Sequence, residues 1–403
     1  MLRFLSLRES GVASPLSLQR AESTRRAFSL DLSRHRDVEH LHQGSINSLA
    51  IDLIESRYLL SGGSCGTIVI HDIENLGGEV THTAKSVSSV DRTHPYCHKF
   101  SIESVCWYPL DTGLFTSSGT DALLKVWDTN KLIPAEEYKC RGKVYSHHMS
   151  PCATKHNLIA VGSASPYVSL IDLKSGSSAH LLKGHKEAVY SVRWSPKDEF
   201  ILASGSQDNQ VLLWDIRSSK GHLKTMDQYN GENASENIGD NTAHNGSVNG
   251  MCFTTDGLHI LSYGTDDCMR LWDSTTGKNT LVNYGRIYND SKKGVEIIVS
   301  SGCAPNIVFV PSKTNIEVFE IFTGLKIGTL MGHFTQVNCC AFNSNYQDLY
   351  SGGSDRNILV WGPEPDPAYD DFLKSKQMVG EDKTNFVKRI GATADTWSSD
   401  EDD

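Results

Sequence analysis

The chain has 403 residues, of which 38% are hydrophobic and 21% are charged, as in an ordinary soluble globular protein. Its net charge of -10 argues against sequence-specific binding of nucleic acid, because such surfaces need clustered lysine and arginine. We find no apolar run near the roughly 20 residues of a membrane helix, and the opening MLRFLSLRESG is too interrupted for a secretory signal.

The segment 1–35 predicts a short helix-loop-helix. Leu2, Phe4 and Leu5 fall on one face of a first helix. A second helix is expected after Ser14, a typical N-cap residue, with Pro15 at its first position and Leu18 on its apolar side. Two helices this short cannot form a core of their own. They are therefore expected to lie on the main domain or to insert into a partner.

From residue 36 the chain repeats one pattern, which is clearest in GHKEAVYSVRWSPKDEFILASGSQDNQVLLWDI, residues 184–216. Histidine, serine, aspartate and tryptophan recur in a fixed order, with tryptophan six positions after aspartate in every set. The four sets are His98, Ser117, Asp121 and Trp127; His185, Ser204, Asp208 and Trp214; His244, Ser262, Asp266 and Trp272; and His333, Ser351, Asp355 and Trp361. We call each set a tetrad.

Three degenerate copies fill the gaps between the tetrads. His71, Ile171 and Phe319 stand in the place of tryptophan, and Cys65 stands in the place of aspartate in the first copy. Successive copies end 42 to 58 residues apart, near the period of about 40 to 45 residues that marks WD40 repeats. The sequence therefore predicts an all-β fold, a seven-bladed WD40 β-propeller over residues 36–362. Because prolines follow Trp361, the segment RDVEHLH (36–42) is expected to complete the last blade.

Ser204, His185 and Asp208 also have the residue types of a hydrolase triad. An enzyme would keep one such set in a cleft, whereas here the set recurs four times with a tryptophan. We therefore interpret the tetrads as structural networks that satisfy buried polar groups, and we expect no catalytic residue.

Two repeat intervals are longer than the others and enlarge one face of the expected ring. The extra residues lie in DRTHPYCH, with Arg92, His94 and Tyr96, and in YNGENASENIGDN, with Tyr229 and Asn230. Loops that outgrow a rigid scaffold commonly carry binding residues. These five residues are our candidates for contact with a substrate, and tolerated insertions are the alternative.

The segment 363–403 is polar and ends in DTWSSDEDD, a composition that predicts disorder. Ser398 and Ser399, directly before the acidic run, are candidate phosphorylation sites. The ten cysteines of the chain include no Cys-x-x-Cys pair. We therefore expect reduced thiols, no bound metal and no other cofactor.

Arg217 follows the pair Trp214-Asp215 in a turn on the face opposite the enlarged loops. An ordinary surface arginine is one interpretation. The stretch from Ile201 to Arg217, with its aliphatic pair, small residues and Trp-Asp-x-Arg, resembles the WDxR box of receptors for cullin-4 ubiquitin ligases. In that family the arginine and an N-terminal helix-loop-helix seat the propeller on a linker protein. The resemblance implies linker contacts from Arg217, Asp215, Leu2, Phe4, Leu5 and Leu18.

Stretches outside the repeat pattern are similar to the Cockayne syndrome group A family. They are RAESTRR, YSHHMSP, NTAHNGSVNG, NTLVNYG and WSSDEDD. This resemblance implies a nuclear substrate receptor in transcription-coupled nucleotide excision repair. Its implied partners are the linker damaged-DNA-binding protein 1, cullin-4 and its RING subunit, RNA polymerase II and the group B translocase. The alternative is a WD40 scaffold in RNA processing or chromatin assembly, which predicts no linker binding.

Overall fold

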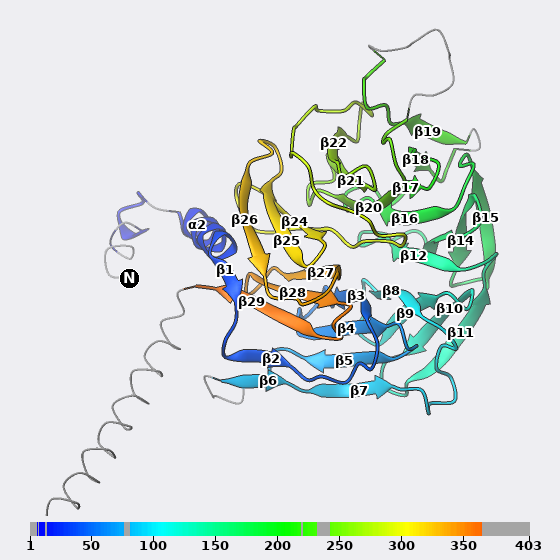
Figure 1. Cartoon of the computed structure of the whole chain (residues 1–403), viewed down its shortest axis with the longest axis horizontal. Helices are drawn as coiled ribbons and strands as arrows, with labels where there is room; N and C mark the ends of the chain where they lie inside the picture. The colour runs from blue at the N-terminus through cyan, green and yellow to red at the C-terminus, as the bar shows by residue number, and fades with distance from the viewer. Residues whose placement is uncertain are drawn as a thin grey trace, which may run out of the picture.

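The computed structural model describes residues 6, 8–12, 14–75, 81–218, 221–231 and 242–364. The described strands form short antiparallel sheets arranged in a ring, a seven-bladed β-propeller (Figure 1). One helix, α2 (Pro15–Phe28), lies at the edge of the ring. The predicted fold class is confirmed.

Each blade is a sheet whose strands follow one another outward from the ring axis. Blade one holds β3 (Ile46–Ile51), β4 (Tyr58–Gly63), β5 (Ile68–Asp72) and β7 (Ser86–Val90); blade two holds β8 (Ile102–Trp107), β9 (Leu114–Gly119), β10 (Leu123–Asp128) and β11 (Ile133–Lys139). Blade three holds β12 (Val144–Met149), β13 (Leu158–Ser163), β14 (Tyr167–Asp172) and β15 (Ser177–Lys183); blade four holds β16 (Val189–Trp194), β17 (Ile201–Ser206), β18 (Val211–Asp215) and β19 (His222–Thr225). Blade five holds β20 (Val248–Phe253), β21 (His259–Gly264) and β22 (Met269–Asp273); blade six holds β23 (Ile298–Val299), β24 (Ile307–Ser312), β25 (Asn315–Glu320) and β26 (Lys326–Met331). Blade seven holds β27 (Val337–Asn343), β28 (Asp348–Gly353), β29 (Ile358–Pro363) and β1 (Leu30–Leu32).

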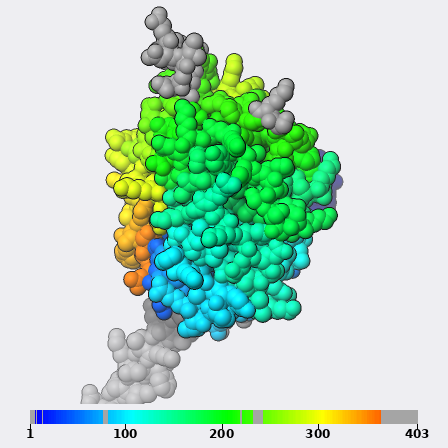
Figure 2. All heavy atoms as spheres, turned by 90° about the vertical axis from the view of Figure 1, so that its right-hand side faces the viewer, coloured from blue at the N-terminus to red at the C-terminus, as the bar shows by residue number. Residues whose placement is uncertain are grey.

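The core of the protein lies between neighbouring blades. Leu212 and Trp214 of blade four, for example, pack in one buried cluster with Val168 and Leu170 of blade three. Inner strands are buried on both faces, because each sheet has a neighbour on either side, and they therefore carry runs of apolar and small residues. In the side view, the residues coloured from cyan to green form one continuous surface (Figure 2).

The strand that closes the ring differs from the expected one. Leu30–Leu32, not 36–42, pairs antiparallel with β29 and completes blade seven. Leu30 lies in the same buried cluster as Trp361, while Asp31 is exposed, so this short strand has the alternation that an edge position requires. The segment 36–42 instead begins with β2 (Arg36–Val38), which pairs parallel with β6 (His82–Ala84). The prediction for the closing strand was therefore wrong.

The propeller has two faces, which antiparallel pairing defines. Connections between the first and second strands of a blade, and between the third and fourth, emerge on what we call the lower face. Connections between the second and third strands, and those leading to the next blade, emerge on the upper face. Arg217 follows the third strand of blade four, so it lies on the lower face.

Blade five is built differently from the others. In the described part of the chain its sheet has three strands, and an isolated bridge from Trp272 to Asn279 stands at the outer edge. The chain from 281 to 297 then runs without regular strands to blade six.

No described helix is long and apolar enough to cross a membrane. All ten cysteines are free thiols.

Candidate functional site

The residues of each tetrad come together inside their blade. In all four sets the histidine Nε2 lies 2.7 Å from the serine Oγ. The tryptophan Nε1 donates to the same oxygen over 2.7 to 2.8 Å. The histidine Nδ1 lies 2.8 to 3.0 Å from a carboxylate oxygen of the aspartate. One geometry therefore recurs in four blades, as a structural network requires, and no single set is distinguished as an active site.

Blade one builds its network from other residues. His42 lies 2.7 Å from Ser61 and 3.0 Å from the hydroxyl of Thr67, so Thr67 rather than Cys65 takes the place of the aspartate. His71, in the tryptophan position, contacts the carbonyl oxygen of Glu39 at 3.2 Å. Sequence spacing missed Thr67 because it lies two residues beyond the expected position.

The pair His147-His148 in β12 is also buried structure. His147 lies 2.8 Å from the hydroxyl of Thr116 and 2.7 Å from that of Ser118. His148 Nδ1 accepts a hydrogen bond from the backbone of Trp194. Among the residues that the structure describes, no group of three histidine, cysteine or acidic side chains is placed to hold a metal ion.

The buried histidines predict a loss of stability in mild acid. Burial lowers the pKa of His42 and of His71 to about 4 and that of His147 to about 3. Unfolding returns each pKa to about 6.5. The unfolded chain then binds more protons, so stability is complete above about pH 6.5 and falls toward pH 4, by at most about 1.4 kcal/mol per pH unit for each histidine.

Urea unfolding at pH 7.5, 6 and 5 would measure this loss. Burial raises the pKa values of Asp121, Asp208 and Asp266, but the hydrogen bond and charge of the tetrad histidine, together with backbone hydrogen bonds, outweigh it, so each pKa is lowered. These carboxylates therefore stay charged at pH 5 and do not add to the effect. Equal midpoints at pH 7.5 and pH 5 would contradict the prediction.

Arg217 is held in a defined position on the lower face. Its Nε and Nη2 donate to the two carboxylate oxygens of Asp215 at 3.0 and 2.7 Å. Its guanidinium carbon lies 4.4 Å from the centre of the Phe200 ring. The side chain nevertheless stays 57% exposed. Hydrogen bonding to Arg217 lowers the pKa of Asp215, which keeps this carboxylate charged.

A groove surrounds this arginine at the boundary of blades four and five. We call it the lower groove; its volume is about 760 Å³, and its lining includes Lys197, Phe200, Arg217, Leu223, Phe253 and Leu258. Leu223 and Leu258 are 46% and 38% exposed. The groove thus combines exposed aliphatic side chains with a fixed guanidinium, a composition typical of protein-binding surfaces. The sequence did not point to Phe200, which supports the arginine, because β17 and β18 lie between Phe200 and Arg217.

The helix α2 begins as predicted, with Ser14 as N-cap and Pro15 in the first turn. Its last turns are fixed to the lower face of blade six, where Thr24 exchanges hydrogen bonds with the backbone of Ala304. Leu18 is 43% exposed. Leu2, Phe4 and Leu5 lie outside the described residues, as do Ser398 and Ser399.

The candidates near residue 94 lie where the sequence placed them, on the upper face between blades one and two. Asp91 binds the backbone of Thr93 and His94 and so fixes a turn. Arg92 and Tyr96 are exposed on that turn, and His94 is half-buried.

The candidates near residue 230 lie elsewhere. Asn230 exchanges hydrogen bonds with the backbone of Asn279 at 2.7 and 2.9 Å. This segment therefore turns along the outer edge of blade five, with Tyr229 47% exposed beside it. The amide of Asn230 has a structural role that its place in the loop did not indicate.

Comparison with known proteins identifies the family. The family model "WD domain, G-beta repeat" (WD40) matches residues 87–128, 176–215, 236–273 and 324–362. The WD repeat-containing protein ATCSA-1 of Arabidopsis thaliana is 35% identical over 94% of this chain and 98% of its own length. The chain belongs to the WD40 repeat family.

Other relatives are less similar to this chain. Radiation-sensitive protein 28 of Saccharomyces cerevisiae is 24% identical over 43% of this chain and 38% of its own length. Meiotic fizzy-related protein 1 of Schizosaccharomyces pombe is 24% identical over 88% of this chain and 77% of its own length. WD40 propellers are typically scaffolds or receptors without catalytic activity, in keeping with the repeated tetrads.

Proposed function

We propose that this WD40 protein is the substrate-recognition subunit of a cullin-4 ubiquitin ligase in nuclear transcription-coupled nucleotide excision repair. Its lower face binds damaged-DNA-binding protein 1, which carries cullin-4 and the RING subunit. Its upper face receives RNA polymerase II and the group B translocase. The similarity to the plant protein ATCSA-1 supports a role as a substrate receptor or scaffold.

One observation carries the assignment of the lower face. Arg217 and α2 are far apart in the sequence, yet the first-to-second connections of blades four and six hold both of them on the same face. The family resemblance assigns the same partner to both features, and one linker can contact both features because they share a face.

The support under Arg217 gives a prediction about Phe200. Replacing Phe200 with alanine removes the ring beneath the guanidinium, and with it a cation–π contact worth about 0.5 to 1 kcal/mol at an exposed site. We expect Phe200→Ala to weaken linker binding by about two- to fivefold, since Asp215 still holds the arginine. Calorimetric titration of the linker measures this. An affinity equal to wild type would show that the ring does not position the arginine.

The upper face gives a separate prediction. Replacing residues 92–96 with glycine and serine removes Arg92, His94 and Tyr96, side chains of the kinds that anchor protein interfaces. We expect linker binding to persist and recruitment of the group B translocase or of RNA polymerase II to fall. Paired pull-downs with both sets of partners decide it. Unchanged recruitment would leave this turn as a tolerated insertion.

A further inference from the structure

The irregular segment between blades five and six carries side chains in strict alternation. Ile287, Asn289 and Ser291 are buried, whereas Arg286, Tyr288, Asp290 and Lys292 are exposed. Alternation of this kind belongs to an extended chain with one face packed. The segment therefore presents a row of polar and aromatic side chains on the upper face.

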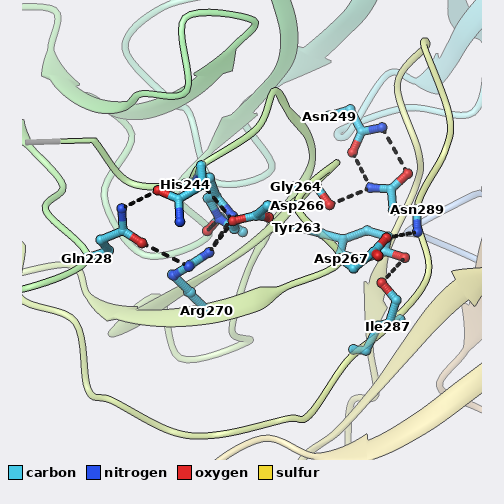
Figure 3. Close-up of polar contacts among 12 residues, drawn as sticks. Gln228, His244, Asn249, Tyr263, Gly264, Asp266, Asp267, Arg270, Ile287 and Asn289 are labelled. Carbon is cyan, nitrogen blue, oxygen red and sulfur yellow. Dashed lines mark hydrogen bonds and ion pairs between the residues drawn. The ribbon is translucent and has the colours of Figure 1, made fainter. Parts of the chain in front are cut away.

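Buried hydrogen bonds hold this segment rigidly against blade five. Asn289 and Asn249 exchange amide hydrogen bonds at 2.7 and 3.2 Å, and Asn289 also donates to the carbonyl of Gly264 (Figure 3). Asp267 accepts from the backbone of Asn289 at 2.9 Å, and the Tyr263 hydroxyl donates to the carbonyl of Tyr288 at 2.9 Å. The backbone that carries Tyr288 is thus fixed before any partner arrives.

Two cations from different turns converge on the exposed Tyr288. The Arg286 guanidinium carbon lies 5.1 Å from the centre of its ring, and the Lys313 ammonium lies 4.2 Å from it. Arg286 is also fixed by Asp267, which accepts from its Nε and Nη2 at 2.9 and 2.8 Å. Tyr288 remains 46% exposed and the Arg286 side chain 71% exposed.

A neighbouring turn on blade seven carries an exposed aromatic residue. The backbone oxygen of Lys313 accepts from the amide of Val337 at 2.7 Å, which ties the turn of Lys313 to the turn before β27. Phe334 in that second turn is 86% exposed. We call Arg286, Tyr288, Lys313 and Phe334 the upper patch.

The upper patch presents more hydrogen-bond donors than acceptors. In the part of the chain that the structure describes, the Lys313 ammonium and the Tyr288 hydroxyl make no hydrogen bond, and Arg286 Nη1 has no carboxylate partner. An anion beside the tyrosine ring would meet an Arg286 guanidinium that Asp267 already holds in place, which lowers the conformational-entropy cost of binding. Tyrosine and arginine are also the residues enriched at the energetic centres of protein interfaces.

We propose that the upper patch binds an acidic segment of a partner protein, whose carboxylates pair with the Lys313 ammonium and the Arg286 guanidinium and whose apolar neighbours pack on the exposed aromatic rings of Tyr288 and Phe334. The charges favour protein over nucleic acid. Asp290 is exposed beside the patch and the chain has a net charge of -10, so a continuous row of phosphates would be repelled while single carboxylates are not. This site lies on blades five to seven, away from the turn at 92–96, and it does not depend on linker binding.

Selection of short random peptides displayed on phage, using the full chain as bait, tests the proposal. Peptides recovered with wild-type protein should be rich in Asp and Glu next to a large apolar residue. Tyr288→Ala and Lys313→Glu should each lower the affinity for the recovered peptides by about tenfold or more. Repeating the selection on Lys313→Glu should recover peptides rich in lysine or arginine instead.

Arg217→Glu is the matched control, because Arg217 is likewise an exposed arginine fixed by an aspartate and an aromatic ring, but on the lower face. It should leave peptide binding unchanged. Recovered peptides without acidic residues, or acidic peptides indifferent to Tyr288→Ala and Lys313→Glu, would overturn the proposal. So would tighter, Tyr288-dependent binding of a single-stranded oligothymidylate probe.

The acidic end of the chain is the competing occupant. Replacing Asp400, Asp402 and Asp403 with asparagine and Glu401 with glutamine removes its carboxylates. Unchanged peptide affinity in this variant supports a partner protein as the occupant. A clear rise in affinity would show that the chain's own end fills the patch, and would overturn the assignment.

Discussion

Trp214→Ala should lower the free energy of unfolding by about 3 to 5 kcal/mol, the usual cost of deleting a large buried aromatic side chain. Trp214 is 1% exposed, packs at the boundary of blades three and four, and donates through Nε1 to Ser204 at 2.7 Å. The substitution therefore leaves both a cavity and a serine that has lost one hydrogen bond. Urea unfolding followed by circular dichroism measures the change.

Phe334→Ala is the matched control for this loss, because Phe334 is also aromatic but 86% exposed. Its free energy of unfolding should stay within about 0.5 kcal/mol of wild type, as for most surface substitutions. A loss below 1 kcal/mol for Trp214→Ala would mean that the tetrad does not stabilise its blade.

Arg217→Glu should weaken binding of damaged-DNA-binding protein 1 by about 2 kcal/mol or more, at least about thirtyfold. The substitution places a carboxylate beside Asp215, so it reverses the charge offered to the linker and adds repulsion within the site. Arg217→Lys keeps the charge but loses the forked pair of hydrogen bonds to Asp215, so a smaller loss is expected. Both variants should keep the melting temperature, because the side chain is 57% exposed.

Arg286→Glu is the control for Arg217→Glu, and calorimetric titration with the purified linker compares them. Arg286 has the same kind of support, from Asp267 and Tyr288, on the opposite face. Its substitution should leave linker affinity at the wild-type value. Equal loss in both variants would point to a general effect of charge rather than to a site at Arg217.

The repeat alone predicted the ring, because the tetrad spacing is a direct consequence of buried hydrogen bonds. Each serine on the second strand must reach a tryptophan on the third, so these two residues lie 10 positions apart in all four tetrads. The histidine comes from the connection before the blade, and it precedes the serine by 18 or 19 positions. The closing strand was missed for the opposite reason. Leu30–Leu32 is three residues long, too short for alternation to be recognised, and its partner lies at the far end of the chain.

The candidate site was predictable in part. Trp214, Asp215 and Arg217 lie within four consecutive residues, so the turn and its face followed from the sequence. Phe200, which carries the guanidinium, and Lys313, which lies over Tyr288, come from neighbouring hairpins. Such pairs are brought together by packing between strands and blades, which no local pattern encodes. Asn230 shows the converse, since a loop residue that suggested binding is used to hold blade five.

Reconstitution of the ligase tests the central claim most directly. The purified full-length chain is mixed with damaged-DNA-binding protein 1, cullin-4 and the RING subunit, and the mixture is separated by size-exclusion chromatography with light scattering. The proposed function predicts that the wild-type chain elutes in a single complex with every component. Arg286→Glu should elute in the same complex, whereas Arg217→Glu should elute separately from the linker. Separate elution of the wild-type chain from the linker would contradict the proposed function and favour a WD40 scaffold of another process.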